Sequence, residues 1–194
     1  MKKLLAIVVL SLLLTTPSQA DDIRDIQIEG MSIGDSLLDY FDKERIEKEK
    51  LYLYEDEGSK EVAVFLYEDS LEAYDRIQVS FEDKDKKYTI VAINGFIDFV
   101  NDIERCDEKK DEIVFELSSI FKNIEKLSDS GKHPGDSTGK STFKRTSFFI
   151  NKFEKRANLE VACFDFSENY ITADKLSVVI MSQEHGDWLT ELYK

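Results

Sequence analysis

The chain has 194 residues, which is enough for one domain or two small ones. It carries 26 Lys and Arg against 40 Asp and Glu, so its formal net charge is −14, or −16 without Lys2 and Lys3. So acidic a surface repels nucleic acid and anionic membranes at long range, which excludes a general nucleic-acid binder. Hydrophobic residues make up 42% of the chain, enough for a core, and only eight glycines and two prolines exclude collagen-like or low-complexity architecture.

The first twenty residues have the pattern of a secretory signal peptide. Lys2 and Lys3 precede an apolar run over residues 4–14, and Ser18 and Ala20 supply small side chains at the −3 and −1 positions of a cleavage site. The apolar run is too short to span a bilayer as a permanent helix. We therefore expect cleavage after Ala20, no membrane span after cleavage, and a single periplasmic or secreted domain over residues 21–194.

The first half of the mature chain predicts one helix and then strands. Asp35 or Ser36 can cap the helix, because apolar residues recur near helical spacing from 37 to 46. Residues 62–67 and 77–82 alternate along the chain and predict strands, the second with one wet face. Residues 88–97 are apolar on both faces, which indicates a more central strand.

The second half repeats this outline. The strongest predicted helix covers residues 102–127, where apolar side chains, Cys106 among them, form one stripe. A polar, Gly- and Ser-rich loop is expected over 128–142, and a short helix around Trp188 near the end. Strands are expected near residues 143–151, 158–166 and 175–183. The pattern predicts an α+β fold: an antiparallel sheet with helices packed on one face, in two helix-plus-three-strand units.

The two cysteines, Cys106 and Cys163, allow at most one disulfide and cannot build a zinc site by themselves. Export places them in an oxidising compartment, where a disulfide can persist. Cys163 shares a face of its predicted strand with Leu159 and Val161, so it can point inward at a packed helix. The alternative interpretation is a pair of buried free thiols.

Residues 34–37, Gly-Asp-Ser-Leu, match by letter the nucleophile block of GDSL hydrolases. That family pairs its serine with an Asp-x-x-His near the C-terminus, because an unassisted serine hydroxyl is a poor nucleophile. Neither His133 nor His185 has an aspartate three residues before it. We therefore interpret Asp35 or Ser36 as a helix cap. A hydrolase that uses Ser36 with His133 is the alternative.

Residues 135–141 resemble a P-loop, but Pro134 stands where that motif has its first glycine. A P-loop leaves a buried strand and enters a helix, whose N-terminus holds the phosphates. Here a charged helix is predicted before the segment and a strand after it. We therefore expect no nucleotide binding and no cofactor.

The window from 131 to 156 is the one basic stretch of an acidic chain. It holds seven Lys and Arg against two acidic residues, and three of the eight glycines. A loop of this composition can bind an anion through backbone amides and ammonium groups together, with phosphate, an acidic glycan or an acidic partner surface as candidates. The alternative is a solvated loop whose charges balance neighbouring carboxylates. The candidate ligand-binding residues are Lys132, His133, Lys140, Lys144 and Arg145.

Several runs, among them residues 28–41, Gly131-Lys-His133, residues 141–144 and Cys163-Phe-Asp-Phe-Ser167, resemble small secreted proteins of marine bacteria that have no assigned function. The resemblance implies a secreted single domain, and it carries over neither an activity nor a catalytic residue.

These observations predict an exported, non-enzymatic binding or interaction domain of the bacterial envelope. Its partner would be an envelope protein or a small anionic ligand, held through loop 128–145. No catalytic residue, metal or cofactor is assigned, and nucleic acid is not an expected partner. The alternatives are a periplasmic serine hydrolase of the GDSL type that uses Ser36, and a purely structural envelope protein.

Overall fold

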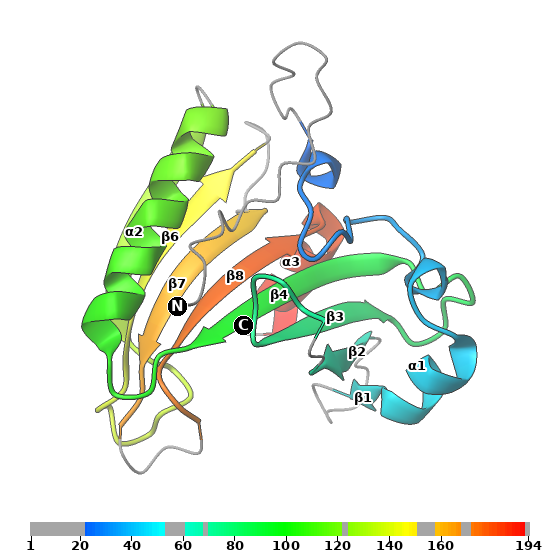
Figure 1. Cartoon of the computed structure of the whole chain (residues 1–194), viewed down its shortest axis with the longest axis horizontal. Helices are drawn as coiled ribbons and strands as arrows, with labels where there is room; N and C mark the ends of the chain where they lie inside the picture. Colours follow the sequence, from blue (N-terminus) through cyan, green and yellow to red (C-terminus); the bar gives the residue numbers. More distant parts are fainter. Residues whose placement is uncertain are drawn as a thin grey trace.

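The computed structural model describes residues 22–52, 61–67, 70–121, 124–150, 158–167 and 172–192, so the predicted signal peptide lies outside the described residues. Within these ranges, one antiparallel sheet has the strand order β1-β2-β3-β4-β8-β7-β6-β5 (Figure 1). Its strands are β1 (Leu51–Tyr52), β2 (Glu61–Leu66), β3 (Arg76–Glu82), β4 (Ile90–Asp98), β5 (Glu125–Lys132), β6 (Thr142–Phe149), β7 (Leu159–Asp165) and β8 (Lys175–Met181).

Short and long helices accompany the sheet: the 3₁₀ turns η1 (Ile23–Asp25) and η2 (Leu37–Asp39), and the α-helices α1 (Lys43–Glu49), α2 (Ile103–Ile120) and α3 (Gln183–Leu192). The described helices include none with both the length and the apolar character that a membrane crossing requires. The predicted antiparallel α+β fold is confirmed, although the sheet dominates it. Each half contains four strands after its helix, where three were expected, and β4 pairs with β8 to join the halves.

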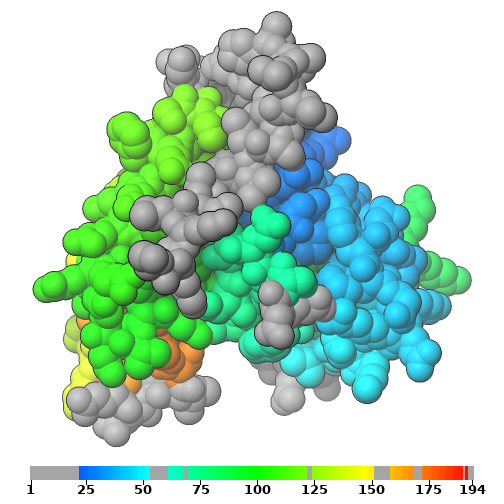
Figure 2. Space-filling view, viewed as in Figure 1, coloured from blue at the N-terminus to red at the C-terminus, as the bar shows by residue number. Residues whose placement is uncertain are grey.

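One face of the sheet carries the main hydrophobic core. Helix α2 packs on β7 and β8, while the segment from η1 to α1 covers β2 to β4, and Figure 2 shows α2 (green) on the left and this segment (blue to cyan) on the right of the same face. The strands alternate as predicted: Ile77, Val79 and Phe81 of β3 are all buried on this face. Cys106 and Cys163 form a disulfide with a Cα–Cα distance of 6.0 Å, which ties α2 to β7 and confirms that prediction.

Helix α3 corrects the expectation that the helices share one face. His185 and Leu189 of α3 line a hollow together with Ser177 and Ala162, whose side chains point away from α2. In Figure 1, α3 accordingly lies behind the sheet and α2 in front of it. The core face is already filled by α2 and the N-terminal segment, so the chain turns to the opposite face at Ser182, immediately after β8.

Two predicted boundaries were also wrong. The helix predicted over 102–127 ends at Ile120, and residues 125–127 together with residues 128–132 of the expected loop form β5. Every residue of β5 is exposed, so its sequence lacks the apolar alternation that would predict a strand. The segment is a strand because it pairs with β6. The first predicted helix is split in two, because Ser36 caps η2 and Asp42 separately caps α1.

Gly95 of β4 lies directly beneath the ring of Tyr74. A Cβ at this position would sit 2.5 Å from the ring atoms Cδ1 and Cε1, and the ring itself is buried. We therefore expect Gly95→Ala to lower the free energy of unfolding by about 2 kcal/mol through overpacking, measured by urea denaturation. The matched test is Gly95→Ala in a Tyr74→Leu background, where most of the cost should vanish. An unchanged cost there would rule out the ring as its cause.

Candidate ligand-binding site

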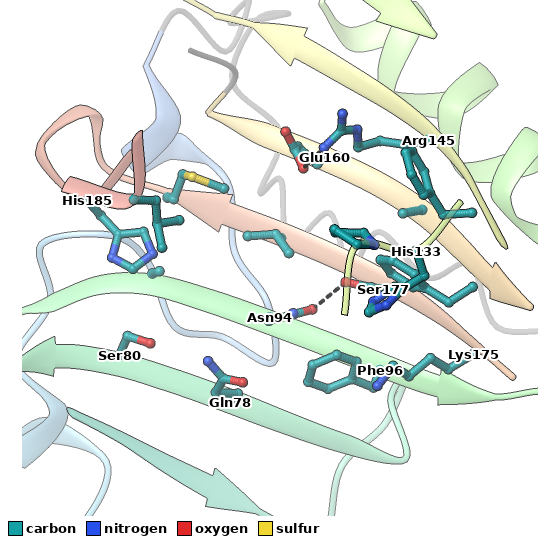
Figure 3. Close-up of a pocket in the computed structure, with 18 of the residues that line it drawn as sticks. Gln78, Ser80, Asn94, Phe96, His133, Arg145, Glu160, Lys175, Ser177 and His185 are labelled. Atoms are coloured by element: carbon teal, nitrogen blue, oxygen red, sulfur yellow. Dashed lines mark hydrogen bonds and ion pairs between the residues drawn. The ribbon is translucent and has the colours of Figure 1, made fainter. Parts of the chain in front are cut away.

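The face of the sheet opposite α2 is hollowed into a cavity of about 570 Å³. Side chains of β3, β4, β6, β7 and β8 line it, together with the turn between β5 and β6 and helix α3 (Figure 3). This volume lies within the range of small-molecule sites. The turn at 133–141 bounds one end of the cavity and α3 bounds the other, so its length follows the strands.

The register of the strands explains why the face is hollow. Phe96, Ser177, Ala162 and Arg145 stand opposite one another on β4, β8, β7 and β6. The two central side chains of this row are small, whereas those at its ends are large. Because cross-strand neighbours on one face lie about 5 Å apart, small central residues leave a depression between the larger ones.

The Lys175 ammonium stands between two aromatic rings at one end of the cavity. Its Nζ lies 5.1 Å from the ring centre of Phe96 and 5.2 Å from that of Phe166. Among the described residues, Lys175 makes no ion pair with a carboxylate. Burial lowers the pKa of Lys175, and the nearby Arg76 lowers it further, while Asp98 opposes the shift. The surroundings therefore leave this charge under-compensated.

Arg145, which lines the cavity, and Arg76, which lies near Lys175, are in contrast paired with carboxylates. Arg145 donates to Asp129 with an Nη2–Oδ2 distance of 2.7 Å, and its Nη1 lies 3.6 Å from Glu160. The hydrogen bond that Arg145 donates to Asp129 raises the pKa of Arg145. Arg76 donates to both carboxylate oxygens of Asp98. Lys175 is therefore the group at this end with the most charge left to offer a ligand.

His133 enters the same end of the cavity from the turn between β5 and β6. Its ring meets those of Phe164 and Phe166 edge-on, with centre-to-centre distances of 5.6 and 5.2 Å. Burial, and then the neighbouring Lys175, lower the pKa of His133, which favours a neutral ring. Nδ1 accepts a hydrogen bond from the Gly135 amide, so the neutral ring carries its hydrogen on Nε2.

The turn that carries His133 is closed by a carboxylate of its own. Asp136 accepts hydrogen bonds from the amide and hydroxyl of Ser141, at 2.8 and 2.6 Å, and from the amide of Thr138 at 2.8 Å. The hydrogen bond from the Ser141 side chain is the largest cause that holds the pKa of Asp136 far below its usual range. In the P-loop-like segment, these donors therefore serve an internal anion and fix the turn.

The structure brings together two of the five residues predicted to bind a ligand. His133 and Arg145 line the cavity. Lys144 lies on the opposite face and pairs with Asp107 of α2. Lys132 and Lys140 are exposed and do not line the cavity.

Sequence reasoning missed Lys175 and the phenylalanines around it. Lys175 begins a strand in which Ser177, Val179 and Met181 share its face, and this alternation is visible in the sequence. The neighbours of that face are not visible there, because they follow from the order β4-β8-β7.

Ser36 has the hydrogen bonds of a cap. Its hydroxyl donates to the carbonyl of Lys87 at 2.7 Å and accepts from the amide of Leu38 at 3.2 Å. His133 and His185 both line the cavity, and Ser36 does not. The described structure therefore places the letters of the GDSL motif at the start of η2, without either histidine beside them.

His185, which lines the other end of the cavity, belongs to a buried acid–histidine pair. Nδ1 of His185 on α3 lies 2.7 and 2.9 Å from the two carboxylate oxygens of Glu61 on β2. The two residues are only 8% and 5% exposed. The indole of Trp188 packs near the imidazole, with ring centres 5.8 Å apart. The pair fastens α3 across the strands that form the cavity floor.

Comparison of the chain with protein-family models, curated proteins and solved structures gives no match. The class that the fold defines is an antiparallel sheet with one face packed against α2 and the other hollowed into a cavity. The cavity has a cationic, aromatic end at Lys175 and a polar end at the Glu61–His185 pair.

Proposed function

We propose that this protein is an exported binding domain that holds a small anionic molecule in the cavity on the open face of its sheet. The observation that carries the proposal is the Lys175 ammonium, half-buried between Phe96 and Phe166 without a carboxylate partner among the described residues. Burying an uncompensated charge costs free energy, and a ligand anion would offset that cost. The site is this cavity, and the 128–145 segment contributes His133 and Arg145 to it.

Two features support export. The first twenty residues have the signal-peptide pattern, and the Cys106–Cys163 disulfide is of a kind that persists in oxidising compartments. The acidic surface of the chain discourages polyanions from adhering at long range. A small anion that reaches the cavity meets the Lys175 ammonium. The negative surface charge and the positive charge in the cavity together favour small anions over polyanions.

Replacing Lys175 by methionine tests the proposal. We expect the variant to bind small carboxylates about 10- to 100-fold more weakly, because hydrogen bonds to charged groups contribute about 1.5–3 kcal/mol. The probes are D-glucuronate and hexanoate, titrated into the mature chain and followed by backbone amide chemical shifts. Lys144→Met is the matched control, since Lys144 lies on the opposite face with Asp107, and it should leave binding unchanged.

The same variant has a second readout in the free protein. Because burial disfavours the charge of Lys175, we expect Lys175→Met to be at least as stable as the wild type in urea. A Lys175→Met variant that loses binding and retains its stability would indicate that Lys175 serves to bind a ligand and does not stabilise the fold. Failure of both carboxylates to bind, or equal binding by Lys175→Met, would sink the proposal.

A further inference from the structure

One wall of the cavity presents polar groups that the described residues leave without partners. Asn94 of β4 accepts a hydrogen bond on Oδ1 from the Ser177 hydroxyl at 2.8 Å, and its Nδ2 makes none (Figure 3). The Gln78 amide and the Ser80 hydroxyl, both from β3, make none among the described residues. Ser80 lines the cavity and is only 2% exposed.

These groups determine whether the part of the ligand beyond its carboxylate should be apolar or polar. An alkyl chain laid along the wall would displace water from two amides and a hydroxyl and return no hydrogen bonds. Each group left without a partner weakens binding about tenfold or more, and sites built to hydrogen-bond a ligand reject analogues that lack the matching groups. A side-chain amide both donates and accepts, so it can bind neighbouring hydroxyl groups.

Resting on the proposed function, we infer that the ligand is an acidic sugar, a uronic acid alone or within a short saccharide. Its carboxylate meets Lys175, and its hydroxyl groups meet Asn94, Gln78 and Ser80. The apolar C–H face of the sugar ring can pack on Phe164, which lines the same end of the cavity. One class of molecule thus satisfies the cation, the amides and the aromatic rings together.

The spacing along the sheet agrees with this class. Lys175 stands opposite Asp98, and Asn94 is four residues from Asp98 along β4, which is about 13 Å of strand. The Lys175 side chain shortens that distance, since its ammonium lies over the rings of Phe96 and Phe166. The cavity of about 570 Å³ extends past Asn94 to Ser80 and His185, which leaves room for a second ring.

The experiment compares three probes on the mature chain: D-glucuronate, D-glucose and hexanoate. We expect glucuronate to bind at least tenfold more tightly than either of the other two. Asn94→Leu and Gln78→Met should each weaken glucuronate binding about tenfold and leave hexanoate binding unchanged or stronger. Gln27→Met is the matched control, because Gln27 is exposed and does not line the cavity.

The outcomes separate the two proposals. Hexanoate binding as tightly as glucuronate, with Lys175→Met weakening both, would overturn the sugar inference and support the anion site. Equal weakening of glucuronate and hexanoate by Asn94→Leu would also overturn the sugar inference. Glucose binding as tightly as glucuronate would overturn the anion site itself. Circular dichroism of each variant establishes that it is folded, and having two amide variants keeps the test decisive if one of them misfolds.

Discussion

Breaking the Cys106–Cys163 disulfide is expected to lower the free energy of unfolding by about 4 kcal/mol. The two cysteines are separated by 57 residues, and the cross-link removes the entropy that this long loop would gain in the unfolded chain. The bond joins α2 to β7, so it also holds the covering of the core onto the sheet. Urea denaturation of oxidised and reduced protein measures the difference.

Two forms of the protein separate the cross-link from the packing of the sulfur atoms. Both cysteines are almost fully buried, so Cys106→Ala with Cys163→Ala also leaves small voids, which add roughly 1 kcal/mol. The reduced wild type keeps the sulfur volume and isolates the effect of the cross-link. Identical unfolding midpoints for the oxidised and reduced proteins would contradict the prediction.

The disulfide also bears on the cavity. Phe164 follows Cys163 on β7 and points to the opposite face, where it lines the ligand site. A fixed Cys163 therefore fixes the backbone from which Phe164 and Ala162 project. We expect the reduced protein to keep its sheet and to bind the small-carboxylate probes more weakly, because an ordered floor lowers the cost of binding.

The elements that could be predicted from the sequence are those in which the burial of one face produces a periodic pattern of apolar residues. Ile77, Val79 and Phe81 of β3 alternate with polar residues because one face of the strand packs against the core, and the apolar stripe of α2 exists for the same reason. Strand β5 has no buried residue, so its sequence shows no apolar alternation that would indicate a strand. It is a strand because it pairs with β6 in a hairpin. Exposed edge strands of this kind are specified by their partners.

The candidate site was predictable only in part, because it depends on which strands become neighbours. Composition singled out the basic window, and two of its residues, His133 and Arg145, do line the cavity. Neighbouring residues on a strand point to opposite faces, so Lys144 and Arg145 cannot share a site there. Lys175 becomes a candidate ligand-binding residue only through the pairing of β8 with β4 and β7, which brings Phe96 and Phe164 beside it.

Replacing Glu61 by alanine is expected to lower the free energy of unfolding by about 3–5 kcal/mol. Glu61 and His185 form a buried pair between β2 and α3, with Nδ1–oxygen distances of 2.7 and 2.9 Å. Removing one partner leaves the other buried without its hydrogen bond, and that residual cost exceeds what the intact pair contributes. The measurement is urea denaturation of Glu61→Ala, with Glu61→Gln as the variant that keeps the volume.

A double variant distinguishes the pair from its two members. Glu61→Met with His185→Leu replaces the pair by apolar side chains of similar size, and such replacements are often neutral or stabilising. We therefore expect the double variant to recover most of the stability that Glu61→Met or His185→Leu loses on its own. If the single costs simply add, the two residues are not coupled and the prediction is wrong.

The double variant also shows what the pair does for the ligand site. His185 lines the cavity at the end away from Lys175, and α3 forms the wall there. If the pair serves to fasten α3, a stable double variant binds glucuronate as the wild type does, since Lys175 and Asn94 are intact. If the imidazole itself contacts the ligand, the double variant is stable and binds more weakly. Stability and affinity measured on this one variant thus distinguish a structural role of His185 in fastening α3 from a direct contact of its imidazole with the ligand.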